Sequence, residues 1–271
     1  MNKELGIFQR VACGQCMQCR IARAREWAFR IKAEMPYFPE GSSFVTWSYM
    51  DEYLPIGGSL VKGDIQKAFK RLRKELTFPI KYFTSGEYGD ESFRPHYHSI
   101  ILGLSPRYIR EKLIFGERVP ETVSGRYVVY QGGSVWPFGT VVVGSVSSSS
   151  IVYVTGYVRK KLNGKLGKEK YGDLTPPFQL QSYGLGFRWA EENKEYLQQN
   201  LIVTENGKKM AIPRYFKKKI DLDVDRMEQV SFEAEKKFYD DCRERGIWTH
   251  EIYEQREKNA VAKAALKKSK I

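Results

Sequence analysis

The chain has 271 residues, of which 42% are hydrophobic, and its 45 lysines and arginines exceed 32 acidic residues to give a net charge of +13. This composition excludes wholesale disorder and favours a polyanionic partner, with nucleic acid ahead of an anionic membrane. No apolar run approaches the roughly 18 residues of a membrane-spanning helix, and we expect no signal peptide. Four cysteines do not make a disulfide framework in a chain this long, so a reducing cytoplasm is expected.

The hydrophobic pattern predicts mixed helices and strands. A helix from about Cys19 to Met35 ends at Pro36, and a later helix is expected to have Asp64 as its N-cap. Between and after them the sequence predicts strands over 44–49, 80–85, 96–101, 126–131 and 140–144, a short helix over 106–115, a helix over 151–162 and charged helical segments from about 187.

The segment Arg94–Ile101 holds two of the three histidines of the chain. On a strand, alternate side chains share a face, so His96 and His98 point one way and Tyr97 points the other way. Two neighbouring imidazoles can bind one divalent metal ion. The competing interpretation is a pair of half-buried structural histidines.

Mg²⁺ and Mn²⁺ prefer oxygen ligands, so a third, carboxylate ligand is expected beside the histidines. Glu87 is our choice because it precedes the histidine strand in a predicted hairpin. Asp90 and Glu91 are rivals, and each of the three carboxylates would otherwise lie in a solvated loop.

Tyr153, Tyr157 and Lys160 are spaced i, i+4 and i+7, which places them on one face of the predicted helix. A tyrosine oxygen can attack a phosphodiester, and a nearby metal ion and lysine favour its phenolate. The alternative is two tyrosines on a half-buried helix with an exposed lysine. The serines at 147–150 can supply the N-cap.

Three cysteines, Cys13, Cys16 and Cys19, precede the first predicted helix at a spacing typical of thiolate metal sites. A structural Zn²⁺ site would need a fourth ligand, for which Cys242 and His250 are the candidates. The alternatives are reduced thiols that cap the basic helix and a redox-labile cluster.

Three segments in this order resemble the motifs of HUH-superfamily rolling-circle replication initiators: Phe44–Tyr49, Arg94–His98 and Tyr153–Lys160. The segment Glu87–Gly89 and the cysteine cluster with its following basic residues are similar to the replication initiators of gokushovirus-type Microviridae, which are small single-stranded DNA phages. The matching segments span residues 13–162, and three ordered motifs are more specific than any one of them.

The resemblance implies a metal-dependent endonuclease that nicks and joins single-stranded DNA to initiate rolling-circle replication. It implies alternating nucleophiles at Tyr153 and Tyr157, each forming a covalent 5′-phosphotyrosine link, with Lys160 as the motif lysine. The metal is Mg²⁺ or Mn²⁺. One departure from the two-tyrosine pattern is Gly156, which stands where lysine often precedes the second tyrosine.

The expected partner is single-stranded DNA at a phage replication origin in the host bacterial cytoplasm. Host helicase and polymerase are further candidate partners, and a membrane is not expected. Basic residues within or beside the motifs are expected to contact the DNA, where phosphate contacts fix position: Arg94, Arg159, Lys161, Arg20 and Arg23.

The element order predicts an α+β fold with a central antiparallel sheet, and the resemblance implies a ferredoxin-like, RRM-like sheet with helical additions. We expect a Cys-rich basic extension over 1–40, the endonuclease core over 41–186 and a charged helical region over 187–271. Two other functions remain open: a single-strand transposase or relaxase of the same chemistry, and a non-catalytic protein that binds single-stranded nucleic acid.

Overall fold

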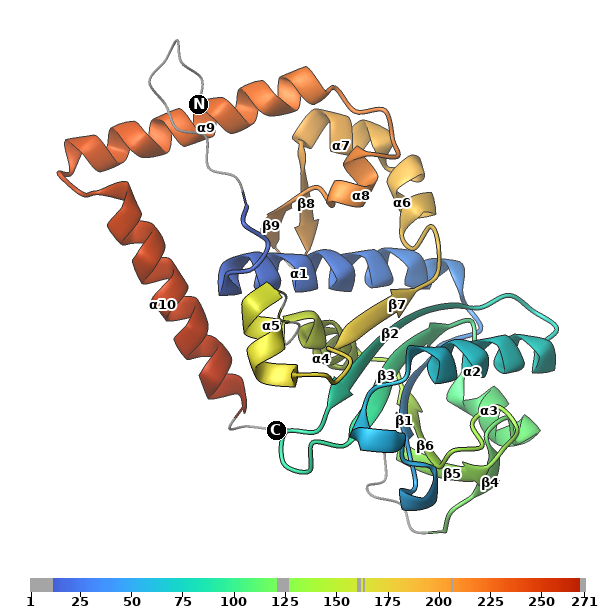
Figure 1. The fold of residues 1–271 in the computed structure, drawn as a ribbon. Coiled ribbons are helices and arrows are strands. Elements are labelled where there is room, and N and C mark those ends of the chain that lie inside the picture. The colour runs from blue at the N-terminus through green and yellow to red at the C-terminus, as the bar shows by residue number, and fades with distance from the viewer. Residues whose placement is uncertain (1–11, 121–126, 160–161, 163, 206, 269–271) are drawn as a thin grey trace. The chain divides into compact units, whose positions relative to one another are not determined.

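The computed structural model describes residues 12–120, 127–159, 162, 164–205 and 207–268. Their fold is α+β and contains a seven-stranded antiparallel sheet with the order β4-β5-β6-β1-β3-β2-β7, which confirms the predicted fold class (Figure 1). Its strands are β1 Ser42–Ser48, β2 Lys81–Tyr88, β3 Pro95–Leu102, β4 Gly116–Arg118, β5 Tyr127–Gly132, β6 Thr140–Ser145 and β7 Phe178–Gln181.

Helices connect and flank these strands. They are α1 Met17–Glu34, α2 Lys62–Glu75, α3 Pro106–Lys112, α4 Ser148–Gly156, α5 Gly164–Tyr171, α6 Phe187–Glu192, α7 Lys194–Asn200, α8 Arg214–Lys217, α9 Val224–Glu244 and α10 Thr249–Lys268. Short 3₁₀ turns are η1 Met35–Tyr37, η2 Asp51–Tyr53, η3 Ile56–Gly58 and η4 Tyr157–Arg159. Within the described part of the chain, no helix combines the length and hydropathy that a bilayer crossing requires.

The chain forms two compact units. One is Arg23–Trp189, which contains the seven-stranded sheet, and the other joins the residues up to Ala22 to those from Ala190 onward. The second unit contains a two-stranded antiparallel sheet, β8 Ile202–Glu205 and β9 Lys208–Ala211, that the helical pattern of this region did not predict. The segment boundaries expected after residues 40 and 186 stay predictions.

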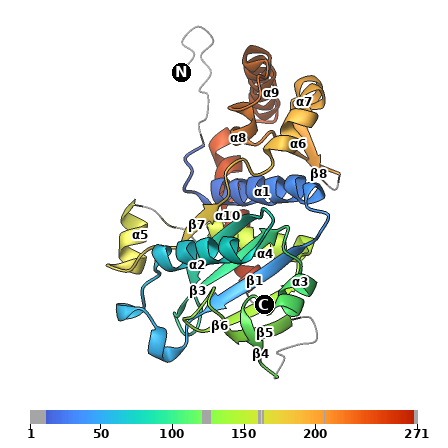
Figure 2. The same cartoon turned by 90° about the vertical axis from the view of Figure 1, so that its right-hand side faces the viewer.

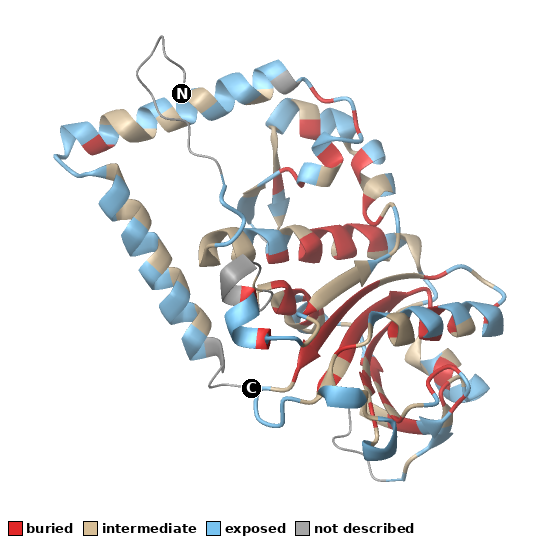
Figure 3. Cartoon of the chain, viewed as in Figure 1, coloured by how far each residue is buried: buried red, intermediate tan, exposed pale blue. Residues whose placement is uncertain are grey.

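Helices cover both faces of the seven-stranded sheet, so its central strands are largely buried (Figure 3). On one face, α2 packs Ile65, Phe69 and Leu72 against a cluster that includes Trp47 and Tyr97. Figures 1 and 2 show α2 running along the sheet. Burial of these large aromatic and aliphatic side chains is the main source of stability for this layer.

The opposite face of the sheet packs against α1 and α4. The α1 side chains Trp27, Ala28 and Ile31 join α4 side chains and strand residues in a second buried cluster, which includes Phe44, Phe83, Ile100, Leu102, Ile151, Val154 and Val158. The apolar stripe predicted for the first helix is therefore buried as expected. This second face also contains His96 and His98, because side chains alternate along β3.

Two expectations about local structure are wrong. The N-cap of α2 is Val61, and Asp64 instead lies in the first turn, where its Oδ2 accepts a hydrogen bond of 2.9 Å from the Tyr49 hydroxyl. The strand predicted over 80–85 extends to Tyr88, because its pairing with β3 continues to Pro95. Glu87 therefore lies on a strand and not in a loop.

The helix predicted over 151–162 begins earlier and ends earlier. Ser147 is its N-cap, and Ser147 and Ser150 form a reciprocal capping box that starts α4 at Ser148. The helix ends at Gly156, and the chain continues as the 3₁₀ turn η4. Glycine has low helix propensity, which fits a change of helix type at this position.

We expect Ser147→Ala to lower the free energy of unfolding by about 1 kcal/mol, because it removes the side-chain oxygen that accepts from the Ser150 amide. Equilibrium urea denaturation followed by circular dichroism measures this change. Ser149→Ala is the matched control on the exposed first turn, where alanine does not remove a cap. Equal stability of the two variants would contradict the capping role.

Candidate metal centre and nucleophile site

The register of three adjacent strands brings the predicted metal ligands together. In the β2–β3 pair, Glu87 lies opposite His96, and in the β1–β3 pair, Thr46 lies opposite His98. The ligand atoms of Glu87, His96 and His98 all lie within 4.8 Å of one another. Glu87 and His98 are buried and His96 is half-buried, so His96 is the most exposed of the three.

Both imidazoles direct Nε2 at the same carboxylate oxygen. The distance from Glu87 Oε1 is 3.1 Å to His96 Nε2 and 3.3 Å to His98 Nε2. The other ring nitrogen of each histidine, Nδ1, also has a hydrogen-bond partner. His96 Nδ1 lies 3.1 Å from the Arg94 carbonyl oxygen, and His98 Nδ1 lies 2.9 Å from Thr46 Oγ1. These outer contacts fix the orientation of both rings.

This donor set fits a divalent cation. A carbonyl oxygen only accepts, so His96 must donate from Nδ1 to Arg94, and a neutral His96 then has a lone pair on Nε2. That lone pair faces the Glu87 carboxylate, which is also an acceptor. A contact between two acceptors requires a bridging proton, carried by Nε2 or by the carboxyl group, or a metal ion between them. Two imidazoles and a carboxylate are a mixed nitrogen and oxygen set suited to Mn²⁺ or Mg²⁺ when water completes the shell.

The rival carboxylates do not join this cluster. Asp90 and Glu91 lie in the exposed connection between β2 and β3, whereas Glu87 is buried on β2. Among the predicted alternatives, only the position that pairs directly with His96 is brought to the imidazoles.

The two tyrosines lie against the same histidine. The Tyr157 ring stacks on the His98 ring with centroids 5.0 Å apart and an interplanar angle of 6°. The Tyr153 ring meets His98 edge to face at 5.1 Å and meets Tyr157 at 4.9 Å. The expectation that the histidine pair and the tyrosine pair share one site is therefore met by the geometry, across a sequence separation of more than fifty residues.

The environments of the two phenols differ. Tyr157 is only 8% exposed, whereas Tyr153 is half-buried. Burial, followed by the negative charge of Glu87 and by Tyr153, raises the pKa of the Tyr157 phenol far above its ordinary value. A cation bound at Glu87 would offset the charge that disfavours the phenolate.

The basic residues predicted from the motifs have different surroundings. The Arg94 guanidinium forms an ion pair with Asp51 and donates a hydrogen bond to the Tyr49 carbonyl oxygen. Arg94 contacts the site through its backbone, because its carbonyl oxygen lies against His96 Nδ1. Arg159 Nε donates to the Gly156 carbonyl at 3.2 Å, and burial lowers the pKa of its guanidinium.

Other predicted residues lie elsewhere or outside the described part. Arg23 is exposed and Arg20 is half-buried on α1. Lys160 and Lys161 lie outside the described residues. The three cysteines form a separate group of their own, and within the described residues neither Cys242 nor His250 belongs to it.

Sequence reasoning missed three supporting side chains. Thr46 holds His98, Phe44 stacks on His98 with centroids 5.8 Å apart, and Ser85 Oγ donates to the Val154 carbonyl at 3.2 Å. Thr46 and Phe44 belong to the first of the three motifs. Their period-two spacing signals a shared face, but only the pairing of β1 with β3 identifies His98 as their partner.

Comparison with known proteins identifies the family. The family model for replication-associated proteins of the ORF2 type matches residues 42–162, which include Glu87, both histidines and both tyrosines of the site. The replication-associated protein ORF2 of Spiroplasma virus 4 is 31% identical over 233 residues, covering 82% of this chain and 71% of that protein. The replication-associated protein VP4 of Bdellovibrio phage phiMH2K is 30% identical over 227 residues, covering 80% and 69%.

A third relative, the replication-associated protein ORF4 of Chlamydia phage 1, is 28% identical over 76% of this chain and 52% of that protein. No solved structure matches the chain. The chain belongs to the family of replication-associated proteins found in Microviridae-type phages, which confirms the resemblance seen in the motifs. This membership gives the chain a role in phage replication.

We expect Thr46→Val to weaken Mn²⁺ binding by about 10- to 100-fold, because the change keeps the side-chain shape and removes the hydroxyl that orients His98. Isothermal titration calorimetry with Mn²⁺ measures the affinity. Thr140→Val on β6 makes the same chemical change outside the site and is the control. Unchanged affinity in the Thr46 variant would show that its hydroxyl does not position a ligand.

Proposed function

We propose that this protein is a metal-dependent tyrosine endonuclease and strand transferase that opens and rejoins single-stranded DNA at a phage replication origin. The observation that carries the proposal is the contact of both Tyr153 and Tyr157 with His98, one of three converging metal-ligand candidates. Family membership supports the replication role, and the net charge of +13 suits a DNA partner in the host cytoplasm.

The chemistry follows from the groups present. A phenol oxygen of Tyr153 or Tyr157 attacks the scissile phosphorus, which forms a tyrosine O–P bond and breaks the P–O3′ bond. The phenol loses its proton, and the departing 3′ oxygen takes up a proton to become a free 3′ hydroxyl. Glu87, His96 and His98 would hold a divalent cation, whose positive charge would polarise the phosphate. Rejoining is the reverse reaction with a 3′ hydroxyl as the nucleophile.

We infer an order for the two tyrosines from their difference in burial. Tyr153 is more accessible and attacks the origin first, and the more buried Tyr157 acts in the second transfer. Two nucleophiles let one cleave while the other still holds a DNA end. The predicted roles of Lys160 in neutralising charge and of Lys161, Arg94, Arg159, Arg20 and Arg23 in contacting phosphates are part of the same proposal.

The two alternatives make different predictions. A transposase or relaxase would use the same chemistry on another DNA sequence, and relatedness to phage replication proteins over most of the chain favours the replication origin. A non-catalytic binding protein would retard single-stranded DNA without ever becoming covalently attached to it. Docking of host helicase or polymerase stays a prediction.

We expect a covalent protein–DNA adduct that resists SDS when the protein is incubated with origin-containing single-stranded DNA and Mn²⁺. Tyr153→Phe should remove most of the adduct of the first cleavage, Tyr157→Phe should impair joining more than cleavage, and the double variant should lose cleavage by at least about a thousandfold. Denaturing gels and mass spectrometry of the nucleotide-linked peptide measure these outcomes.

Tyr53→Phe removes a hydroxyl from an exposed tyrosine on η2 and serves as the control that should cleave normally. Normal cleavage by the double variant would refute the nucleophile assignment. A larger loss of first cleavage in Tyr157→Phe than in Tyr153→Phe would reverse the proposed order.

The metal assignment has its own test. We expect His96→Ala combined with His98→Ala, or excess EDTA with the unmodified protein, to abolish adduct formation while single-stranded DNA is still bound, because the ligands polarise the phosphate and do not supply the bulk of the positive charge. Fluorescence anisotropy measures DNA binding beside the cleavage assay. Metal-dependent cleavage that survives the double histidine change would place the metal elsewhere.

A further inference from the structure

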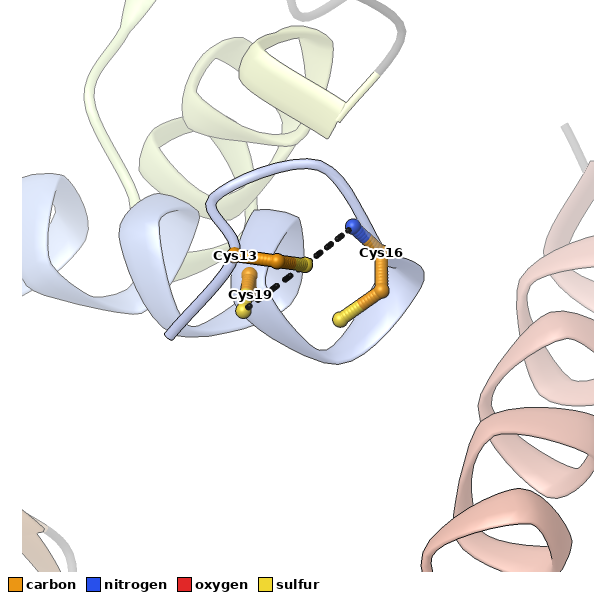
Figure 4. Close-up of side chains that lie close together, drawn as sticks. All are labelled: Cys13, Cys16 and Cys19. Carbon is orange, nitrogen blue, oxygen red and sulfur yellow. Dashed lines mark hydrogen bonds between the residues drawn. The ribbon is translucent and has the colours of Figure 1, made fainter. Parts of the chain in front are cut away.

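The cysteine cluster is a second group of metal-ligand side chains, separate from the site that contains the tyrosines. The Sγ atoms of Cys13, Cys16 and Cys19 all lie within 4.8 Å of one another, and those of Cys13 and Cys19 are 3.9 Å apart. Figure 4 shows the three side chains converging from the turn before α1 and from its first residues. All four cysteines of the chain are thiols that form no disulfide.

The backbone of the turn stabilises a thiolate at the first cysteine. The amides of Gln15 and Cys16 both donate to Cys13 Sγ, at 3.4 Å and 3.3 Å. Two amide donors favour the charged thiolate form of an exposed cysteine, which is the form that binds a metal ion.

We propose that Cys13, Cys16 and Cys19 bind one Zn²⁺ ion through three thiolates, with the fourth coordination position open to water. Tetrahedral zinc with Zn–S bonds of about 2.3 Å holds its sulfurs about 3.8 Å apart, close to the 3.9 Å between Cys13 and Cys19. A [4Fe–4S] cluster fits less well, because each of its thiolates binds a different iron and the sulfurs must lie further apart.

The predicted fourth protein ligand is not part of this site. Within the described residues the cluster contains no other histidine, cysteine or carboxylate. Cys242 is a buried residue outside this cluster. Binding releases the protons of the thiols, and three thiolates with Zn²⁺ and a neutral water carry a net charge of −1. This charge lies at the start of α1, where the helix dipole favours a negative group and the first turn has no acidic residue of its own.

The helix α10 contacts the start of α1, directly after the cysteine turn. The Glu257 carboxylate on α10 accepts hydrogen bonds from the amides of Met17 at 2.6 Å and Gln18 at 3.1 Å, which are the first residues of α1. The Gln18 side chain donates in turn to the Tyr253 carbonyl at 3.5 Å. Zinc would therefore fix the turn that presents these amides to α10, and the turn, the first residues of α1 and α10 all belong to one compact unit.

The test uses the full chain, expressed and purified under reducing conditions without chelator, and measures bound metals by mass spectrometry. The stripped protein is then titrated with Co²⁺, because a sulfur-to-cobalt charge-transfer band reports thiolate ligands and the histidine–carboxylate site cannot produce it. We expect about one zinc per chain, an intense charge-transfer band with one equivalent of Co²⁺, and displacement of that band by Zn²⁺.

Cys16→Ser and Cys19→Ser should each weaken Zn²⁺ binding by at least about tenfold in competition with a chromophoric chelator. Cys242→Ser is the matched control and should leave the cobalt band unchanged, because it replaces the one cysteine outside the cluster. Three results on the unmodified chain would each overturn the proposal: no thiolate band with cobalt, iron and sulfide in place of zinc, or a disulfide formed within the cluster under reducing conditions. These results do not depend on whether the protein cleaves DNA.

Discussion

The antiparallel pairing of β3 with β1 and β2 is the constraint on which the candidate site depends. This register puts Glu87 opposite His96 and Thr46 opposite His98, so one strand receives a ligand from one neighbour and an orienting hydroxyl from the other. Because side chains alternate, a shift of one residue would turn Tyr97 toward the site and both histidines into the opposite layer. The large aromatic residues packed on that layer make such a shift costly.

The sheet face that contains the candidate ligands His96 and His98 also packs against α4, which contains Tyr153 and leads into Tyr157. Apolar side chains of α4, such as Ile151 and Val154, are buried in the cluster between the sheet, α1 and α4. This packing places the rings of Tyr153 and Tyr157 against His98. Stability and chemistry are therefore coupled at this position. The burial that orients Tyr157 also raises the pKa of its phenol, so positive charge at Glu87 would favour the phenolate that the proposed chemistry needs.

The two proposed metal sites differ in the softness of their ligands. Imidazole and carboxylate suit a hard or borderline cation with open positions for phosphate, whereas three thiolates select a soft cation and hold it in a fixed geometry. Two different cations, one held by imidazole and carboxylate and one held by thiolates, could therefore be bound by one chain. Each site is formed by residues of a single compact unit.

The sequence by itself determined the α+β class and the strand and helix that carry the motifs, and it singled out the candidate ligands and phenols, since alternation and helical spacing are local properties of the chain. It did not reveal that Glu87 lies on a strand, that Gly156 changes the helix to a 3₁₀ turn, or that Thr46 holds His98. These features depend on which strands pair and in which register. That choice is made by burial across the whole sheet, so only the tertiary structure decided that the imidazoles and phenols meet.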